Sequence, residues 1–150
     1  MTALHTLLHN KNISFEMIAH PQPIRSAQDG ADYFGIEIGQ TAPTLVLETD
    51  RGYISAILSG DRGRLDFQKI AAILGCREVK LASPQKVEEI TGFRIGTVPL
   101  VGLFLPCLFD RSLFRYPEVY GGTGETHSTL KISPVDVEAV NQVLAYLEYP

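Results

Sequence analysis

The sequence predicts a single α+β domain, residues 1–150, with a mixed, mostly antiparallel central sheet and flanking helices. Three observations predict this class. Segments with the apolar spacing of helices alternate along the chain with short strand-like segments. A Thr-Asp-Arg-Gly turn at residues 49–52 joins two of those strands as an antiparallel hairpin. No repeat or low-complexity linker divides the chain, and 150 residues with 45% hydrophobic content suffice for one core.

The first part of the chain is expected to contain two helices, a strand and the hairpin. Leu4, Leu7 and Leu8 share one face of a helix. Ser26 is a suitable N-cap for the second helix, and Gly35 suits the left-handed residue that ends it. In order, these signals place a helix ending at residues 10–12, a strand over residues 13–20, a helix over residues 27–34, and hairpin strands over residues 45–48 and 53–58.

The second part is expected to end in a long helix. Ser133 can cap it, Pro134 occupies the first position, where a missing N–H has no cost, and an apolar stripe continues to Leu147. Gly75 is expected to end one earlier helix, and the Ser83-Pro84 pair is expected to begin another. In order, we expect a helix over residues 65–74, a strand over 78–82, a helix over 84–92, a loop over 93–102, strands near 102–109, 118–121 and 128–132, and the final helix.

Composition excludes several functional classes. Two cysteines and the lack of an N-terminal apolar run after a basic start predict a cytoplasmic protein without a disulfide framework. No segment has the roughly 18 apolar residues of a membrane span. The net charge of −4 argues against DNA binding. Residues 60–94 nevertheless carry seven cations and five acids, which fits either a surface for one end of an RNA or an ordinary solvated face.

Familiar catalytic and cofactor motifs are missing. The chain has no G-x-S-x-G elbow, no phosphate-binding P-loop and no G-x-G-x-x-G opening a helix, so we expect no cofactor. His5 and His9 have the spacing of a zinc helix but lack the accompanying Glu and a third ligand, so we expect no metal site. Cys107 lies in an apolar strand and is interpreted as a buried, inert thiol.

Two glycine-containing loops and two histidines remain as candidates for contacts with a substrate. In the loops at residues 93–102 and 121–124, backbone N–H groups could approach a ligand closely enough to stabilise an oxyanion, although a bare structural turn fits residues 121–124 equally well. His20 could contact a substrate or donate to a main-chain carbonyl, and His127 has the same two interpretations.

Six short motifs occur in a fixed order along the chain. They are His20-Pro21, Pro43 to Leu47, Ser59-Gly60-Asp61, Thr91-Gly92-Phe93 running to Gly96-Thr97-Val98-Pro99, Gly121 to Gly124, and Ile132-Ser133-Pro134. Together they resemble the YbaK/EbsC family, free-standing editing domains that hydrolyse mischarged aminoacyl-tRNA. The resemblance spans roughly residues 20–136 and rests on order and spacing rather than on one motif.

The resemblance implies an aminoacyl-tRNA deacylase that cleaves the ester of a small amino acid, with the tRNA acceptor end and an aminoacyl-tRNA synthetase as partners. A ribose hydroxyl and loop N–H groups would assist the reaction, so no side-chain nucleophile is required. The catalytic positions expected are Gly96, Thr97, Gly122 and Gly124. The substrate-binding positions expected are His20, Pro43, Thr44, Gly60, Asp61, Pro99, His127 and Asp136.

One departure from the family pattern leaves the function open. A lysine expected before Thr44, thought to hold the terminal nucleotide, is replaced by Pro43, which has neither charge nor donor. Another cation such as Arg62, Lys80 or Lys131 could replace it, the site could take a different ligand, or activity could be lost. The alternatives to an enzyme are a non-catalytic binding module and a regulatory protein.

Overall fold

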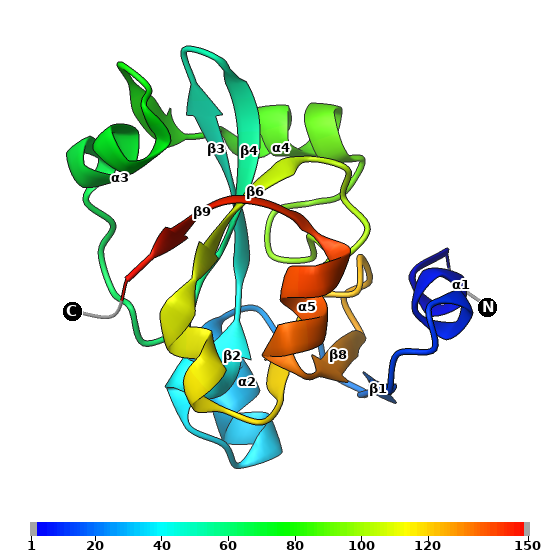
Figure 1. Cartoon of the computed structure of the whole chain (residues 1–150). Coiled ribbons are helices and arrows are strands. Elements are labelled where there is room, and N and C mark those ends of the chain that lie inside the picture. Colours follow the sequence, from blue (N-terminus) through cyan, green and yellow to red (C-terminus); the bar gives the residue numbers. More distant parts are fainter. Residues whose placement is uncertain (1–2, 149–150) are drawn as a thin grey trace.

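The computed structural model describes residues 3–148 and confirms the α+β class (Figure 1). Its helices are α1 (Ala3–Asn10), α2 (Ala27–Phe34), α3 (Phe67–Leu74), α4 (Pro84–Thr91) and α5 (Pro134–Val140), with short 3-10 helices η1 (Ile38–Gln40) and η2 (Arg111–Arg115). Its strands are β1 (Phe15–Ala19), β2 (Thr41–Ala42), β3 (Thr44–Thr49), β4 (Gly52–Ile57), β5 (Val79–Leu81), β6 (Pro106–Asp110), β7 (Val119–Gly121), β8 (Ser128–Ile132) and β9 (Gln142–Leu147).

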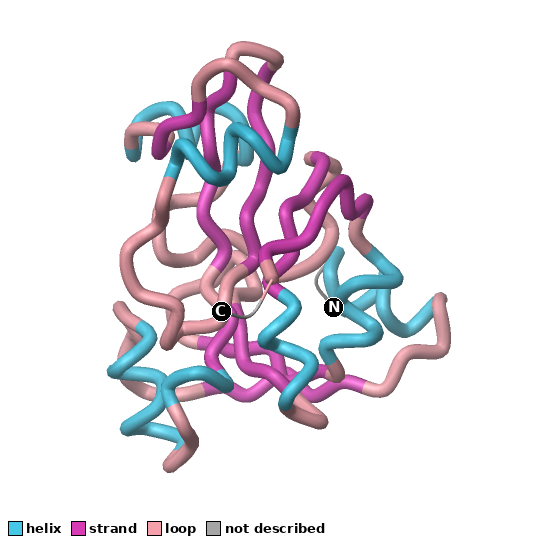
Figure 2. Tube along the Cα trace, turned by 60° about the vertical axis from the view of Figure 1, so that its left-hand side comes forward, coloured by secondary structure: helices cyan, strands magenta, loops and turns pink. Residues whose placement is uncertain are grey.

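The strands form two mixed sheets instead of one central sheet (Figure 2). One sheet has the order β1-β8-β7-β2 and the other the order β5-β3-β4-β6-β9. The β3–β4 hairpin is antiparallel with Thr44 opposite Ile57, as the turn predicted, whereas β4, β6 and β9 run parallel to one another. The chain passes from the first sheet to the second at Pro43, between β2 and β3.

The predicted helix ends are confirmed by their capping contacts. The side chain of Ser26 accepts a hydrogen bond from the backbone N–H of Asp29, and Ser83 and Ser133 cap α4 and α5 in the same way. Gly35, like the glycines that end α3 and α4, has the left-handed backbone conformation, with a φ of 65°. Local sequence therefore determines where α2 and α4 begin and end, where α3 ends and where α5 begins.

The predicted long final helix is wrong in its second half. Helix α5 ends at Val140, and residues 142–147 form strand β9, which pairs in parallel with β6. Asn141 has an extended backbone, and its side-chain amide donates to the carbonyl oxygens of Leu100 (3.0 Å) and Val137 (2.9 Å). The free edge of β6 offers backbone hydrogen bonds to residues 142–147, which are rich in apolar side chains. Sequence spacing alone does not report this non-local pairing.

The strand expected near residues 102–109 begins later than predicted. Residues 102–105 remain a loop, and β6 starts at Pro106. Phe104 in this loop is fully exposed and has a φ of 46°. A positive φ is incompatible with a regular strand, so this residue keeps the loop out of the sheet.

The apolar core is divided between the two sheets and the helices that cover them. One cluster joins α1 and α5 to the first sheet and to β6 through residues such as Leu8, Phe109 and Val137. A second cluster packs α3 against the other sheet around Leu47 and Ile70, and α4 packs on a smaller third cluster. No helix among the described residues has the length and apolar character to cross a membrane.

Candidate functional site

A cavity of about 250 Å³ lies where the two sheets meet. Its walls come from β2, β3, β7 and β8, from the start of α2, and from the two glycine-containing loops. Phe34 and Tyr120 form an aromatic part of the lining, with their ring centroids 4.9 Å apart. The polar residues that line the cavity include Ser26, Thr41, Thr44, Ser128 and Thr129. The cavity therefore combines an apolar wall with several hydrogen-bonding groups, as small-molecule sites commonly do.

The two glycine-containing loops meet at this cavity. Gly96 lines it from the first loop, and Gly121 and Gly122 line it from the second. The backbone N–H of Leu100 donates to the carbonyl oxygen of Gly122 at 2.9 Å, which joins the loops directly. A Cβ atom at Gly122 would collide with the carbonyl oxygen of Val98. Only glycine permits this close approach, so the contact between the loops depends on its missing side chain.

Several polar groups at the cavity have no internal partner. Within residues 3–148, the backbone N–H of Gly96 donates no hydrogen bond, whereas Gly122 directly follows the residue of β7 that pairs with Ala42 of β2. The buried hydroxyl of Thr44 is likewise without a hydrogen-bond partner there. Buried polar groups in proteins are normally satisfied, so unpaired donors beside a cavity are available for a ligand. A backbone N–H donor beside a cavity can stabilise an oxyanion.

His20 supports the cavity wall from behind and does not line it. Its side chain is 5% exposed, and its Nδ1 donates to the carbonyl oxygen of Gln22 at 2.6 Å. Its Nε2 lies 3.0 Å from the hydroxyl of Thr129, a cavity residue. With Nδ1 protonated, Nε2 accepts from that hydroxyl. Of the two interpretations of His20, the structure confirms the donor to a main-chain carbonyl.

Of the twelve predicted site residues, the cavity contains four: Pro43, Thr44, Gly96 and Gly122. Thr97, Pro99 and Gly124 belong to the two loops but do not line it. The hydroxyl of Thr97 donates to the carbonyl oxygen of Arg94 at 2.8 Å, which closes the turn around Gly96. Gly124, with a φ of 97°, packs against the ring of Phe93. Thr97 and Gly124 thus shape the loops that carry the cavity glycines.

His127 and Asp136 lie outside the cavity lining. His127 is exposed in the β7–β8 loop, where its Nδ1 lies 2.8 Å from the hydroxyl of Thr126, and its carbonyl oxygen accepts the N–H of His20. Asp136 is in the first turn of α5, where a carboxylate is favourable to the helix dipole. Asp136 is thus placed as a helix-end residue outside the cavity lining.

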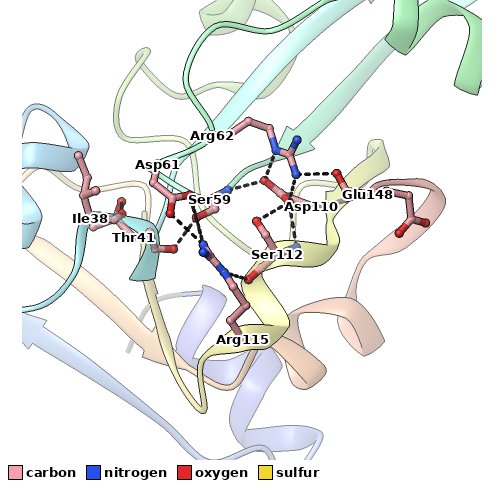
Figure 3. Close-up of polar contacts among 10 residues, drawn as sticks. Ile38, Thr41, Ser59, Asp61, Arg62, Asp110, Ser112, Arg115 and Glu148 are labelled. Atoms are coloured by element: carbon pink, nitrogen blue, oxygen red, sulfur yellow. Dashed lines mark hydrogen bonds and ion pairs between the residues drawn. The ribbon is translucent and has the colours of Figure 1, made fainter. Parts of the chain in front are cut away.

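Gly60 and Asp61 belong to a polar cluster that holds β2 in place (Figure 3). A Cβ atom at Gly60 would collide with the Thr41 hydroxyl and the Ile38 carbonyl oxygen, so glycine is needed for this contact. The backbone N–H of Gly60 donates to the carbonyl oxygen of Thr41 at 2.9 Å. Asp61 accepts from the Ser59 hydroxyl at 2.8 Å and pairs with Arg115 at 3.1 Å. Because Thr41 lines the cavity, these two residues position its wall without lining it.

Asp110 is the centre of this cluster and is fully buried. Arg62 binds its carboxylate through two N–H groups, both at 2.7 Å. The Ser59 N–H and both the N–H and hydroxyl of Ser112 also donate to it. Burial alone would raise the pKa of Asp110, but the hydrogen bonds, first those from Arg62 and Ser112, outweigh it and lower the pKa. Asp110 is therefore a charged, internally satisfied structural group.

None of the three cations considered as replacements for the missing lysine lines the cavity. Arg62 is bound to Asp110, Lys80 pairs with Glu48 at 3.2 Å, and Lys131 lies 3.6 Å from Glu118. The charged residues of the lining are Arg25 and Glu125, which sequence reasoning missed. A usable signal for Arg25 was its place immediately before Ser26, the N-cap of a predicted helix that follows one of the motifs.

The two cysteines and the histidines form no metal centre in the structure. Among residues 3–148, no group of three or more His, Cys, Asp or Glu side chains is arranged to hold a metal ion. Cys107 is fully buried, as predicted, and burial raises the pKa of its thiol to about 11. A thiol with that pKa carries almost no thiolate near neutral pH, so Cys107 is a poor nucleophile.

Comparisons with known proteins agree with this geometry. The model of the aminoacyl-tRNA editing domain family matches residues 21–140. The proline–tRNA ligase of Geobacter metallireducens is 30% identical over 105 residues, which are 70% of this chain and 18% of the ligase. The proline–tRNA ligase of Thermosipho melanesiensis is 30% identical over 86 residues, 57% of this chain and 15% of the ligase. The chain thus spans less than a fifth of these relatives.

A solved structure extends the likeness over almost the whole chain. It is that of a candidate trans-editing enzyme for prolyl-tRNA synthetase, with 31% sequence identity and a TM-score of 0.82. The match covers 95% of this chain and 92% of that protein. Together with the family match over residues 21–140, it shows that the chain belongs to the aminoacyl-tRNA editing domain family.

Proposed function

We propose that the protein is a trans-acting deacylase, which removes a small, wrongly attached amino acid from tRNA. The observation that supports this most strongly is the cavity between the two sheets, which Gly96, with its unpaired backbone N–H, and Gly122 line from two loops in a chain of the editing family. A deacylase of this kind needs donors for a developing oxyanion more than it needs a nucleophilic side chain. The cavity lining offers such a donor in the backbone N–H of Gly96.

The proposed reaction is hydrolysis of the ester between the amino acid and the terminal ribose. Water attacks the ester carbonyl carbon, and the carbonyl oxygen gains negative charge that backbone N–H groups of the glycine loops, first that of Gly96, stabilise. The bond between that carbon and the ribose oxygen then breaks, and the water proton passes to the ribose oxygen. The products are the free amino acid and tRNA with an intact ribose hydroxyl. Removing one such donor typically lowers kcat about 100-fold to 1,000-fold.

The relatives indicate which tRNA to test first. The sequence relatives are proline–tRNA ligases, and the solved structure is of a candidate trans-editing enzyme for prolyl-tRNA synthetase. We therefore propose proline tRNA carrying a wrong, small amino acid as the substrate class, with the acceptor end as the part that enters the cavity. Prolyl-tRNA synthetase is the proposed partner that releases this substrate.

A deacylation assay tests the proposal. Proline tRNA charged with alanine, cysteine or serine is incubated with the protein, and the correctly charged prolyl-tRNA serves as the control substrate. We expect faster release of at least one small amino acid than of proline. Equal release from all four substrates, at the uncatalysed rate, would contradict the proposal.

A non-catalytic binding module is the second candidate, and the proline at position 43 favours it. Pro43 lines the cavity, where a lysine is expected from the family resemblance, and contributes neither charge nor donor. An inactive wild-type protein that gains deacylation as Pro43→Lys, and that binds an aminoacyl-adenosine mimic in both forms, would support this candidate over the enzyme.

A further inference from the structure

Two residues of opposite charge line the cavity, and they come from different elements. Arg25 precedes α2, whereas Glu125 lies in the loop between β7 and β8. Both residues are exposed to solvent at the cavity. A ligand that carries an anionic group therefore meets one cation there, and that cation is Arg25.

The main chain at Arg25 is held in place. Its backbone N–H donates to the carboxylate of Asp29 at 3.3 Å, and the Ser26 hydroxyl accepts the N–H of Asp29 at 3.0 Å. These contacts fix the position of Arg25 at the start of α2. The carboxylate of the neighbouring acid, Asp29, accepts the backbone N–H of Arg25 and forms no ion pair with the Arg25 guanidinium.

Over residues 3–148, the guanidinium of Arg25 is unpaired and lines the cavity, unlike that of Arg62. In the part of the chain that the structure describes, its side chain forms no ion pair or hydrogen bond. Arg62, by contrast, is committed to the buried Asp110 through two hydrogen bonds of 2.7 Å. An unpaired guanidinium presents a fork of donors that matches a phosphate group.

We propose that Arg25 binds the phosphate on the 5′ side of the terminal adenosine of the tRNA substrate. This rests on the proposed deacylase function, because the ester is then held between the glycine loops while the nucleotide lies beside the start of α2. In a tRNA acceptor end the phosphate is the anionic group nearest to the reacting ester. Arg25 is a positioning residue, since it touches the substrate's phosphate and not the reacting atoms.

Binding measurements with 5′-AMP and adenosine test the phosphate contact without any need for catalysis. The wild-type protein should bind 5′-AMP about tenfold or more tighter than adenosine, the range for a charge-assisted hydrogen bond. Arg25→Gln should abolish this difference, and Arg25→Lys should retain part of it. Arg51→Gln is the matched control, because Arg51 is an exposed cation in the β3–β4 turn, outside the cavity lining. Equal preference for 5′-AMP in Arg25→Gln and wild type, or no preference in the wild type, would overturn the proposal.

Deacylation kinetics separate this proposal from the proposed function. With mischarged tRNA, Arg25→Gln should raise KM about tenfold and change kcat little. With an aminoacyl-adenosine that lacks the phosphate, Arg25→Gln and wild type should be equal. A loss on both substrates would refute the phosphate role. A wild-type protein that hydrolyses neither substrate refutes the deacylase function, while its preference for 5′-AMP still decides the role of Arg25.

Discussion

Two polar regions of this molecule are built in opposite ways. The carboxylate of Asp110 receives five hydrogen bonds from Ser59, Arg62 and Ser112, within a buried cluster. At the cavity, the N–H of Gly96 and the hydroxyl of Thr44 are unpaired among the described residues. Polar groups that are satisfied internally stabilise the fold, whereas polar groups left unsatisfied beside a cavity are available to a ligand. By this criterion, the residues around Asp110 support the fold, and the residues with unpaired groups at the cavity are candidates for binding a ligand.

The largest effect is expected from removing the centre of the satisfied cluster. Asp110→Ala leaves Arg62 partly buried without its carboxylate partner and should lower the free energy of unfolding by ~3–5 kcal/mol. Ser112→Ala is the matched control, because it removes one hydrogen bond and should lower that free energy by ~1 kcal/mol. Urea denaturation measures both. Equal stability of the two variants would show that the cluster is not organised around Asp110.

Acid should weaken the same cluster. The pKa of Asp110 is lowered in the folded protein, so its contribution to stability is complete above the ordinary Asp pKa of about 4 and is lost as the pH falls through the lower folded value. The urea midpoint of the wild type should therefore fall more steeply than that of Asp110→Asn between about pH 5 and about pH 2. Parallel pH profiles of the two proteins would contradict this assignment.

A smaller effect is expected where a glycine supports the cavity loops. A Cβ atom at Gly124 would lie 2.6 Å from the Phe93 ring, and the φ of 97° disfavours any side chain. Gly124→Ala should therefore destabilise the protein by ~1–3 kcal/mol and lower deacylation. Gly63→Ala provides the control, since Gly63 also has a positive φ but no atom near its Cβ position. If the two alanine variants unfold at the same urea concentration, the contact with Phe93 has no energetic role.

The smallest stability effect is expected at the unpaired hydroxyl of the cavity. Thr44→Val removes a buried hydroxyl that has no partner among the described residues, so the free energy of unfolding should change by less than ~0.5 kcal/mol. Thr41→Val removes a hydroxyl that donates to the Ile38 carbonyl oxygen at 2.7 Å and should lose ~1 kcal/mol. Binding of an aminoacyl-adenosine mimic should weaken in Thr44→Val. Wild-type affinity together with clear destabilisation would mean that the Thr44 hydroxyl serves the fold instead.

Sequence reasoning located the loops of the site better than its individual residues. The glycines at positions 96 and 122 were found because glycine marks backbone that can approach another group closely. The family resemblance predicts that Gly60 and Asp61 bind substrate, but the two residues hold β2 from outside the cavity. A motif shows that a residue matters to the site, but burial and hydrogen-bond partners decide whether it lines the cavity or supports it. Arg25 belongs to none of the six motifs, and its place before the N-cap Ser26 does not by itself show that it lines the cavity.

The sequence by itself determined the α+β class, the capped ends of the helices and the β3–β4 hairpin, because these depend on neighbouring residues whose caps, turns and apolar spacing act locally. Only the tertiary structure decided that two sheets form, that residues 142–147 become a strand, and that the two glycine loops share one cavity with Arg25. Those features depend on pairing between segments far apart in the chain. The free edge of β6 and the junction at Pro43 exist only after the rest of the chain has folded around them.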